Sequence, residues 1–111
     1  MPEKEYKPPE EQETRRKEQL ISLAKKCAKL LKTKYKVNRI FLIGSLVKGH
    51  VHDRTDIDIV VEGLAPELYM DALVDANDIL QRAVTLNLIP FEDAFESLRE
   101  KTIKEGELIY E

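Results

Sequence analysis

Asp56 and Asp58 are separated by a single residue at the start of a predicted strand, residues 56–62. Because side chains alternate along a strand, the two carboxylates should point to the same face. Carboxylates that close repel each other, and burying them unpaired would cost several kcal/mol. Mg²⁺ removes this penalty, since it prefers oxygen ligands and usually binds one or two carboxylates together with substrate phosphates. The pair therefore predicts a catalytic Mg²⁺ site with both aspartates as ligands.

A glycine-rich segment precedes this pair, with ten residues between Ser45 and Asp56. Gly44 lets the backbone approach a phosphate, and Ser45 offers a hydroxyl and an amide donor. Lys48 adds a positive charge for a triphosphate, and Gly49 keeps the loop compact. Gly-Ser alone is often a turn, and Asp-x-Asp alone is often a solvated strand end. Together and in this order they predict a bound nucleoside triphosphate, whose reaction needs positioning and charge neutralisation.

The first elements that must position these residues are a helix and two strands. A helix is predicted from about residue 10, because its apolar residues recur at three- and four-residue steps. The stripe consists of Leu20, Leu23, Ala24, Cys27, Leu30, Leu31 and Tyr35. Cys27 is expected to be a small buried hydrophobe rather than a reactive thiol. An apolar strand over 40–43, one helical turn over 46–48 and a polar loop over 50–55 lead to the strand at 56–62.

The second half of the chain predicts two helices and a third strand. A helix opens at Pro66, and its buried stripe is expected to contain Tyr69, Ala72, Leu73, Ala76, Ile79, Leu80 and Ala83. A strand over 84–89 ends at Pro90, and a last helix starts at Phe91. One face of that helix is expected to contain Phe91, Ala94, Phe95, Leu98 and Thr102. Residues 108–110 form an edge strand or pack as a tail. The order α-β-β-α-β-α predicts an α/β (α+β) fold with a small mixed sheet covered by helices.

Length and composition indicate a single domain. The chain has 111 residues, of which 42% are hydrophobic and 35% charged, so we expect a folded domain over 10–111 after a flexible tail, 1–9. No run approaches the roughly 18 apolar residues of a membrane span. A single cysteine and a polar N-terminus without a signal-peptide core predict a cytoplasmic protein.

Charge is distributed unevenly along the chain. Residues 1–39 contain 12 basic and 6 acidic residues, a net charge of +6, whereas residues 40–111 contain 6 basic and 15 acidic residues, a net charge of −9. The basic first helix is compatible with an acidic partner or RNA. A solvated helix face is favoured over a nucleic-acid surface, because no aromatic residues interleave with the charges. Nucleic acid is therefore not the expected partner.

The central motifs resemble those of the nucleotidyltransferase superfamily that includes DNA polymerase β, and most of all its small MNT-type members. Residues 44–49, Gly-Ser-Leu-Val-Lys-Gly, resemble the family's Gly-Ser-x-Ala-Arg-Gly, with Lys48 in place of arginine. Residues 55–58, Thr-Asp-Ile-Asp, resemble its Ser-Asp-x-Asp. Residues 86–94 are similar to its third-strand segment, and 103–111 are typical of the ends of small members. The likeness covers about residues 15–111.

This resemblance implies a Mg²⁺-dependent nucleotidyltransferase that transfers AMP from ATP. Asp56 and Asp58 would be the metal ligands, and Gly44, Ser45, Lys48 and Gly49 would bind the nucleotide. Small members of the family are often antitoxins encoded beside a HEPN-domain toxin, which they modify with AMP. The resemblance therefore implies a HEPN-domain partner and leaves homo- or hetero-oligomers open.

Asn87 departs from the family pattern, in which a third carboxylate stands at this position. That carboxylate helps to activate the attacking hydroxyl and completes the metal site. Asn87 can ligate a metal weakly through its carbonyl oxygen, but a neutral amide is no general base. Two hypotheses remain open: an enzyme that works with two aspartates, or a weak or inactive nucleotide-binding module with a regulatory or assembly role. A third hypothesis is an RNA-binding adaptor that uses the basic first helix.

Overall fold

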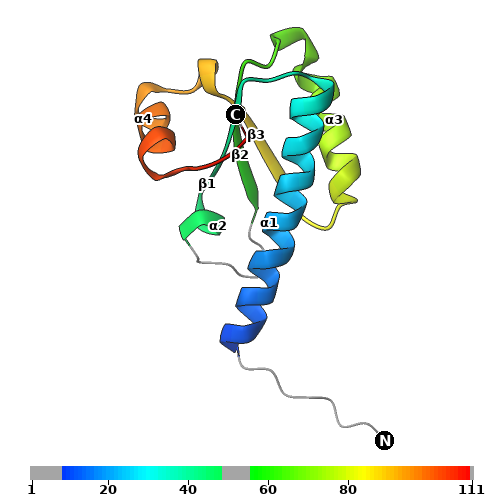
Figure 1. The fold of residues 1–111 in the computed structure, drawn as a ribbon, viewed down its shortest axis with the longest axis vertical. Helices are drawn as coiled ribbons and strands as arrows, with labels where there is room; N and C mark the ends of the chain where they lie inside the picture. Colours follow the sequence, from blue (N-terminus) through cyan, green and yellow to red (C-terminus); the bar gives the residue numbers. More distant parts are fainter. Residues whose placement is uncertain (1–8, 49–55, 111) are drawn as a thin grey trace, which may run out of the picture.

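The protein is an α+β domain built on one small sheet (Figure 1). The computed structural model describes residues 9–48 and 56–110, and among their side chains those of residues 15–44, 46–47 and 56–110. In chain order the elements are α1 (Pro9–Lys34), β1 (Arg39–Ile43), α2 (Ser45–Lys48), β2 (Ile57–Glu62), the 3₁₀ turn η1 (Pro66–Leu68), α3 (Tyr69–Leu80), β3 (Leu86–Pro90), the 3₁₀ turn η2 (Phe91–Asp93), α4 (Glu96–Glu105) and β4 (Glu107–Tyr110).

The four strands lie in the order β3-β2-β1-β4. β1 pairs antiparallel with β2 and with β4, whereas β2 and β3 are parallel. A parallel pair needs a crossover connection, and α3 provides it. The amino ends of β2 and β3 therefore lie side by side, at the edge of the sheet where β1 ends. This mixed sheet confirms the predicted fold class.

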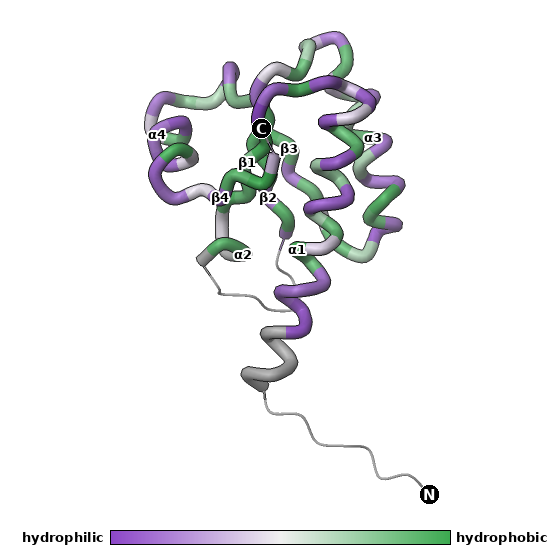
Figure 2. Tube along the Cα trace, in the orientation of Figure 1, coloured by the Kyte–Doolittle hydropathy of each residue, from purple (hydrophilic) through white to green (hydrophobic). Residues whose placement is uncertain are grey.

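Helices cover both faces of the sheet. α1 and α3 pack against each other over one face, and α4 lies on the other (Figure 1). Figure 2 shows hydrophobic residues gathered in the strands, and hydrophilic residues alternating with them along the helices. The α1 stripe predicted from the sequence is the buried side of that helix. Its fully buried members are Leu20, Ala24, Cys27 and Leu31.

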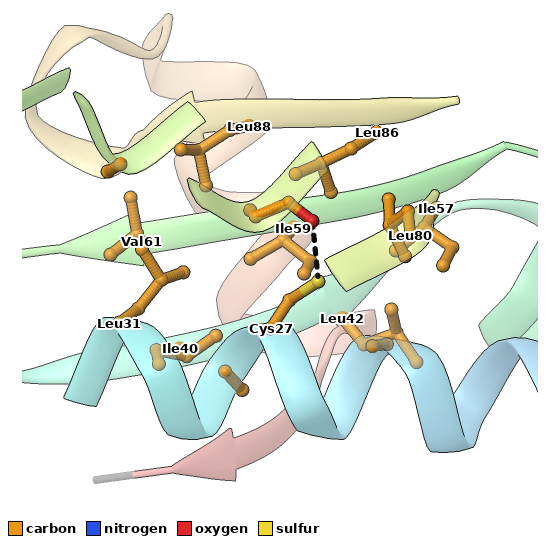
Figure 3. Close-up of a cluster of buried hydrophobic side chains, with 14 of the residues drawn as sticks. Cys27, Leu31, Ile40, Leu42, Ile57, Ile59, Val61, Leu80, Leu86 and Leu88 are labelled. Atoms are coloured by element: carbon orange, nitrogen blue, oxygen red, sulfur yellow. Dashed lines mark hydrogen bonds between the residues drawn. The ribbon is translucent and has the colours of Figure 1, made fainter. Parts of the chain in front are cut away.

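The larger core lies between α1, α3 and the sheet (Figure 3). Ile40, Leu42, Ile57, Ile59 and Val61 point into it from the two central strands. Cys27 is fully buried within it, and its thiol donates a hydrogen bond of 3.7 Å to the carbonyl oxygen of Ala76. Burial raises the pKa of the Cys27 thiol to about 11. The prediction that this cysteine is a small buried hydrophobe is confirmed.

A smaller core lies between the sheet and the side of α4. Phe41, Ile43 and Val60 form it, and Phe91 and Leu98 pack against them. The rings of Phe41 and Phe91 are stacked with centroids 6.5 Å apart. Because so few apolar side chains of α4 take part, this face of the sheet is covered more thinly than the other.

α3 ends earlier than its apolar pattern predicts. Gln81 and Arg82, which follow the helix, adopt positive φ angles of 48° and 62°. These left-handed residues break the helical periodicity, and Ala83 is consequently exposed. The prediction that Ala83 belongs to the buried stripe is therefore wrong. The other six predicted positions are buried or half-buried.

The third strand is displaced from the predicted residues 84–89 to 86–90. Pro90 does not follow this strand, as predicted, but belongs to it as its last residue and pairs with Val61. β3 lies at the edge of the sheet, where proline is tolerated because its missing N–H can face the open side.

The last helix does not begin at Phe91, as its sequence pattern predicts. Phe91 instead opens the 3₁₀ turn η2, and Ala94 and Phe95 are extended, with ψ of 147° and 151°. Helical periodicity therefore starts at Glu96, and Phe95 is 85% exposed rather than buried. Because of this interruption, a buried helix face predicted from Phe91 onward wrongly includes Phe95. Leu98 and Thr102 do face inward, as predicted.

The predicted first helix and a strand at 107–110 are both present. α1 begins at Pro9, one residue before the predicted start, and the remainder of the predicted tail lies outside the described residues. Residues 107–110 form β4, which confirms the edge strand as the correct alternative. Within the described residues, no helix is long and apolar enough to cross a membrane.

Candidate active site

The first strand of the site is β2, which presents Asp58. Ile57 and Ile59 are fully buried in the larger core, so the alternation of the strand directs Asp58 to the opposite face. Asp56 lies directly before the strand and is exposed, whereas Asp58 is half-buried. The single-residue spacing thus places both carboxylates on one face, as the sequence predicts.

β3 brings Asn87 beside these carboxylates. In the parallel register Asn87 is the partner of Asp58, and its neighbours Leu86 and Leu88 are buried in the larger core. The Asn87 amide Nδ2 donates a hydrogen bond of 2.6 Å to Asp58 Oδ1 and a longer one of 3.5 Å to Asp56 Oδ2. The cluster therefore joins Asn87 to two carboxylates that lie 31 and 29 positions away in the sequence. The amide offsets part of the repulsion between the two carboxylates.

Gly44 closes the cluster from β1. Ile43 is the antiparallel partner of Asp58, so the chain leaves β1 next to that carboxylate. Gly44 has a φ of 84°, a conformation that residues with a Cβ rarely adopt. A Cβ at this position would also lie closer to Asp58 Oδ2 than van der Waals contact allows. The fold therefore requires glycine here for two reasons, its backbone angle and the space that Asp58 occupies.

The remaining predicted residues lie in and after α2. This short helix starts at Ser45, directly after Gly44, and ends at Lys48. The side chains of Ser45 and Lys48 lie outside the described part of the structure, as does the whole of Gly49. The structure thus brings Gly44, Asp56, Asp58 and Asn87 together, and the nucleotide contacts predicted for the other three residues stay predictions.

The charge at this cluster is not balanced by described cations. Over residues 15–44, 46–47 and 56–110, neither aspartate has an ion pair. Other carboxylates are paired: Lys34 Nζ and the Tyr35 hydroxyl hydrogen-bond to Asp75 Oδ2 at 2.6 and 2.5 Å. These hydrogen bonds, first that of Lys34, hold the pKa of Asp75 below its usual value. Among the described side chains, the two carboxylates of the site thus have no ion-pair partner, unlike Asp75.

The donor set fits a hard divalent cation such as Mg²⁺. The two carboxylates supply the number of protein carboxylates that Mg²⁺ usually takes. A half-turn of the Asn87 amide would replace Nδ2 by its carbonyl oxygen, a weak third ligand. Among the described residues, no group of three or more His, Cys, Asp and Glu side chains could hold a metal. In the described part of the chain, the site therefore has two carboxylates and one amide rather than a triad of acids.

Two features of the structure were not visible in the sequence. The contact between Gly44 and Asp58 depends on the pairing of β1 with β2, which no local pattern reveals. A cavity of about 640 Å³ lies at the opposite, carboxyl ends of β2 and β3 and does not include the carboxylate pair. It is lined by Gly63, Leu64, Ala65, Pro66, Tyr69, Pro90, Glu92 and Asp93.

The sequence matches the model of a known protein family. A sequence-family model described as polymerase beta, nucleotidyltransferase, matches residues 25–111. The chain belongs to this nucleotidyltransferase family. The match spans Gly44, Asp56, Asp58 and Asn87, and it confirms the resemblance on which the family was predicted. No functionally curated protein matches the sequence significantly.

Solved structures share the fold of this nucleotidyltransferase-family chain. A toxin–antitoxin complex with AMP-PNP aligns with a TM-score of 0.65 at 21% identity, over 78% of this chain and 72% of that chain. A candidate nucleotidyltransferase from Sulfolobus solfataricus aligns with a TM-score of 0.57 at 17% identity, over 92% and 87%. A tri-AMPylated Shewanella oneidensis HEPN toxin in complex with MNT antitoxin gives 0.51 at 18%, over 88% and 71%. At these identities the likeness shows a shared fold.

Proposed function

We propose that this nucleotidyltransferase-family protein transfers AMP from ATP, with Mg²⁺, to a HEPN-domain partner protein in a toxin–antitoxin pair. The observation that carries the proposal is the cluster of Asp56, Asp58 and Asn87 beside Gly44. The partner is supported by the structural neighbours, which include a HEPN toxin with its MNT antitoxin. We further propose that residues 10–111 act as one domain and that the protein works in the cytoplasm.

In this proposal each residue of the cluster has a defined task. Asp56 and Asp58 would hold Mg²⁺, and the bound metal would supply positive charge to neutralise the triphosphate. Gly44 leaves room for the backbone to approach the phosphates, and Ser45, Lys48 and Gly49 contact them. An acceptor hydroxyl oxygen then forms a bond to the α-phosphorus, and the bond from that phosphorus to the β-phosphate oxygen breaks. Pyrophosphate leaves with the electron pair of the broken bond.

Asn87 limits what this site contributes to the proton transfer. Its amide is neutral and cannot accept the proton of the acceptor hydroxyl. The acceptor must therefore lose its proton to another group or to solvent. We expect the rate to depend mainly on positioning and charge neutralisation by Asp56 and Asp58.

A second function is favoured by the same contact. The hydrogen bond of 2.6 Å from Asn87 Nδ2 to Asp58 Oδ1 stabilises the carboxylates without a metal. Such a site would suit a regulatory or assembly module that binds a nucleotide or the partner but turns over slowly or not at all. In that case ATP with Mg²⁺, or the partner, should raise the melting temperature without release of pyrophosphate.

Transfer of label from ATP distinguishes the two functions. The protein is incubated with Mg²⁺, ATP radiolabelled at the α-phosphate, and a HEPN-domain protein encoded beside it. We expect label on the partner with the wild type and none with Asp58→Asn. Asp78→Asn, at an exposed position of α3, is the matched control and should label normally. Absence of label with both the wild type and Asn87→Asp would overturn the catalytic proposal.

A further inference from the structure

A groove between α1 and the end of β4 carries basic side chains. It has a volume of about 470 Å³ and is lined by Glu18, Ile21, Ser22, Lys25, Lys26, Lys29 and Tyr110. We call this the α1 groove. The lining residues of α1 recur at three- and four-residue steps and therefore form one face of the helix, about 17 Å long at 1.5 Å per residue.

The fold makes little use of the lysines on this face. Lys25, Lys26 and Lys29 are exposed, and in the described part of the chain none of them has a hydrogen bond or ion pair through its ammonium group. Lysines nearer the end of α1 behave differently. Lys32 Nζ donates to the carbonyl oxygen of Val37 at 3.0 Å, and Lys34 pairs with Asp75. The three groove lysines are thus free to meet a ligand.

Charge complementarity indicates an anionic ligand. Residues 15–39 contain ten basic residues and one acid, Glu18, in a chain whose net charge is −3. A local positive surface on an acidic protein attracts and orients a partner of opposite charge.

The composition of the groove favours a protein over a nucleic acid. Ile21 and Tyr110 are half-buried against the larger core and give the groove an apolar floor. Tyr110 is the one aromatic side chain in the described lining, whereas successive bases would need several on which to stack. Carboxylates around an apolar side chain match this surface better than a polynucleotide.

We propose that the α1 groove docks an acidic protein segment in which carboxylates flank an apolar side chain. The inference rests on the proposed function only for the identity of the partner, the acceptor protein. Figure 1 shows the first turns of α1 extending past the sheet at the end where α2 lies. α2 directly follows Gly44, so this end also holds the candidate active site. The Glu18 end of the groove points toward this end of the sheet, whereas Tyr110 pairs with Ile40 near the other end of β1.

Peptide binding tests this surface directly. The probe is a fluorescent helical peptide with glutamate and leucine on one face, compared with the same peptide carrying glutamine for glutamate. Fluorescence anisotropy should show binding of the acidic peptide only, weakening as salt shortens the screening length from about 10 Å at 0.1 M to about 3 Å at 1 M. The combined variant Lys25→Glu, Lys26→Glu and Lys29→Glu should weaken binding by about tenfold or more.

The control variant reverses the same number of charges elsewhere. Arg99, Lys101 and Lys104 are exposed on α4, on the other side of the sheet. Their replacement by glutamate should leave peptide affinity within about twofold of the wild type, because long-range charge effects are screened by salt. Circular dichroism of both variants establishes that α1 and α4 stay helical.

The inference is wrong if the wild type does not bind the acidic peptide, or if the α1 variant binds it as tightly as the wild type. Two further outcomes would also overturn it. Tighter binding of an oligouridylate of similar length, lost in that variant, would assign the groove to nucleic acid. Conversion of an oligomer to a monomer by the α1 variant, seen by light scattering, would assign it to a second copy of the chain.

The proposed function can fail without this inference failing. The α1 variant should bind Mg²⁺-ATP like the wild type, and Asp58→Asn should bind the acidic peptide like the wild type. Peptide binding without transfer of label would contradict only the catalytic proposal. Transfer of label without peptide binding would contradict only the docking surface.

Discussion

The carboxylates at the two ends of the parallel strands β2 and β3 have different hydrogen-bond partners. At the carboxyl end, Glu62 accepts two hydrogen bonds from the Arg39 guanidinium, at 2.8 and 2.7 Å. At the amino end, Asp58 and Asp56 share the neutral amide of Asn87. At the first end, the charge of Glu62 is balanced by Arg39. The second end has two negative charges and, among the described side chains, no cation.

Both ends also contain a glycine with a positive φ. Gly44 has a φ of 84° and Gly63 a φ of 89°, and a Cβ on either would clash with a neighbouring side chain. The neighbour is Asp58 at one end and Asn38 at the other. The two glycines thus have the same backbone conformation. Only Gly44, at the amino end, makes room for a side chain that we propose binds a ligand. The difference separates structural ion pairing from charge that we propose is held for a ligand.

Asp58→Asn should have the largest effect on activity. Loss of one of two carboxylates that would hold Mg²⁺ should lower transfer of AMP at least about a hundredfold, because metal stabilisation of the transition state is worth several kcal/mol. The melting temperature should change little or rise, since the substitution removes repulsion from Asp56. Steady-state rates and thermal unfolding check both outcomes. Activity within a few-fold of the wild type would contradict the assignment.

Gly44→Ala and Gly63→Ala form a matched pair for the two ends. Each should lower the free energy of unfolding by about 1–2 kcal/mol or more, because a Cβ is disfavoured at positive φ. Only Gly44→Ala should also abolish binding of Mg²⁺-ATP, since its Cβ displaces Asp58. Urea unfolding and nucleotide titration measure the two quantities. Equal loss of nucleotide binding in both variants would remove the distinction between the ends.

Asn87→Asp should destabilise the protein when no divalent cation is present. The change replaces a hydrogen-bond donor to Asp58 by a third negative charge, at a cost of about 1–3 kcal/mol. Mg²⁺ should recover most of this loss, and transfer of AMP should rise. Asn77→Asp is the control, because Asn77 is exposed on α3 and its amide donates to a backbone carbonyl, that of Leu73. The same Mg²⁺ effect in both variants would argue against a specific site.

The Arg39–Glu62 pair should have the smallest effect. The hydrogen bonds that Arg39 donates to Glu62 hold the pKa of the Glu62 carboxyl below its ordinary value of 4.5. A lowered pKa in the folded state stabilises the protein above about pH 4.5, and this stabilisation is lost as the pH falls through the lowered value. Because both side chains are partly exposed, Glu62→Gln should cost less than about 1 kcal/mol at pH 7. The cost should vanish in unfolding measurements at acidic pH, and nucleotide binding should be unchanged.

The sequence predicted those parts of the site that depend on local spacing. The alternation of a strand places Asp56 and Asp58 on one face, and the α1 stripe follows from helical periodicity. The family resemblance predicted that Asn87 belongs to the site, but the contact of Asn87 with Asp58 depends on the register of β2 and β3. The requirement for glycine beside Asp58 depends likewise on the pairing of β1 with β2. Such contacts join distant segments and leave no periodic signal.

Errors in the predicted fold occur where backbone angles interrupt a pattern. Gln81 and Arg82 turn left-handed after α3, so Ala83 leaves the stripe. Ala94 and Phe95 are extended, so counting from Phe91 puts Phe95 on the wrong face. Periodicity reports which residue types recur, but it does not report where the regular backbone stops.

Titration calorimetry with α,β-methylene-ATP tests the central claim most directly. In this analogue the bond that transfer would break is replaced by a stable one, so binding is measured without turnover. The account predicts that the wild type binds the analogue only with Mg²⁺, and that Asp56→Asn or Asp58→Asn weakens this binding at least about tenfold, since each removes a metal-binding carboxylate. Binding that is independent of Mg²⁺, or unchanged by both substitutions, would contradict a magnesium–triphosphate site at the amino ends of β2 and β3.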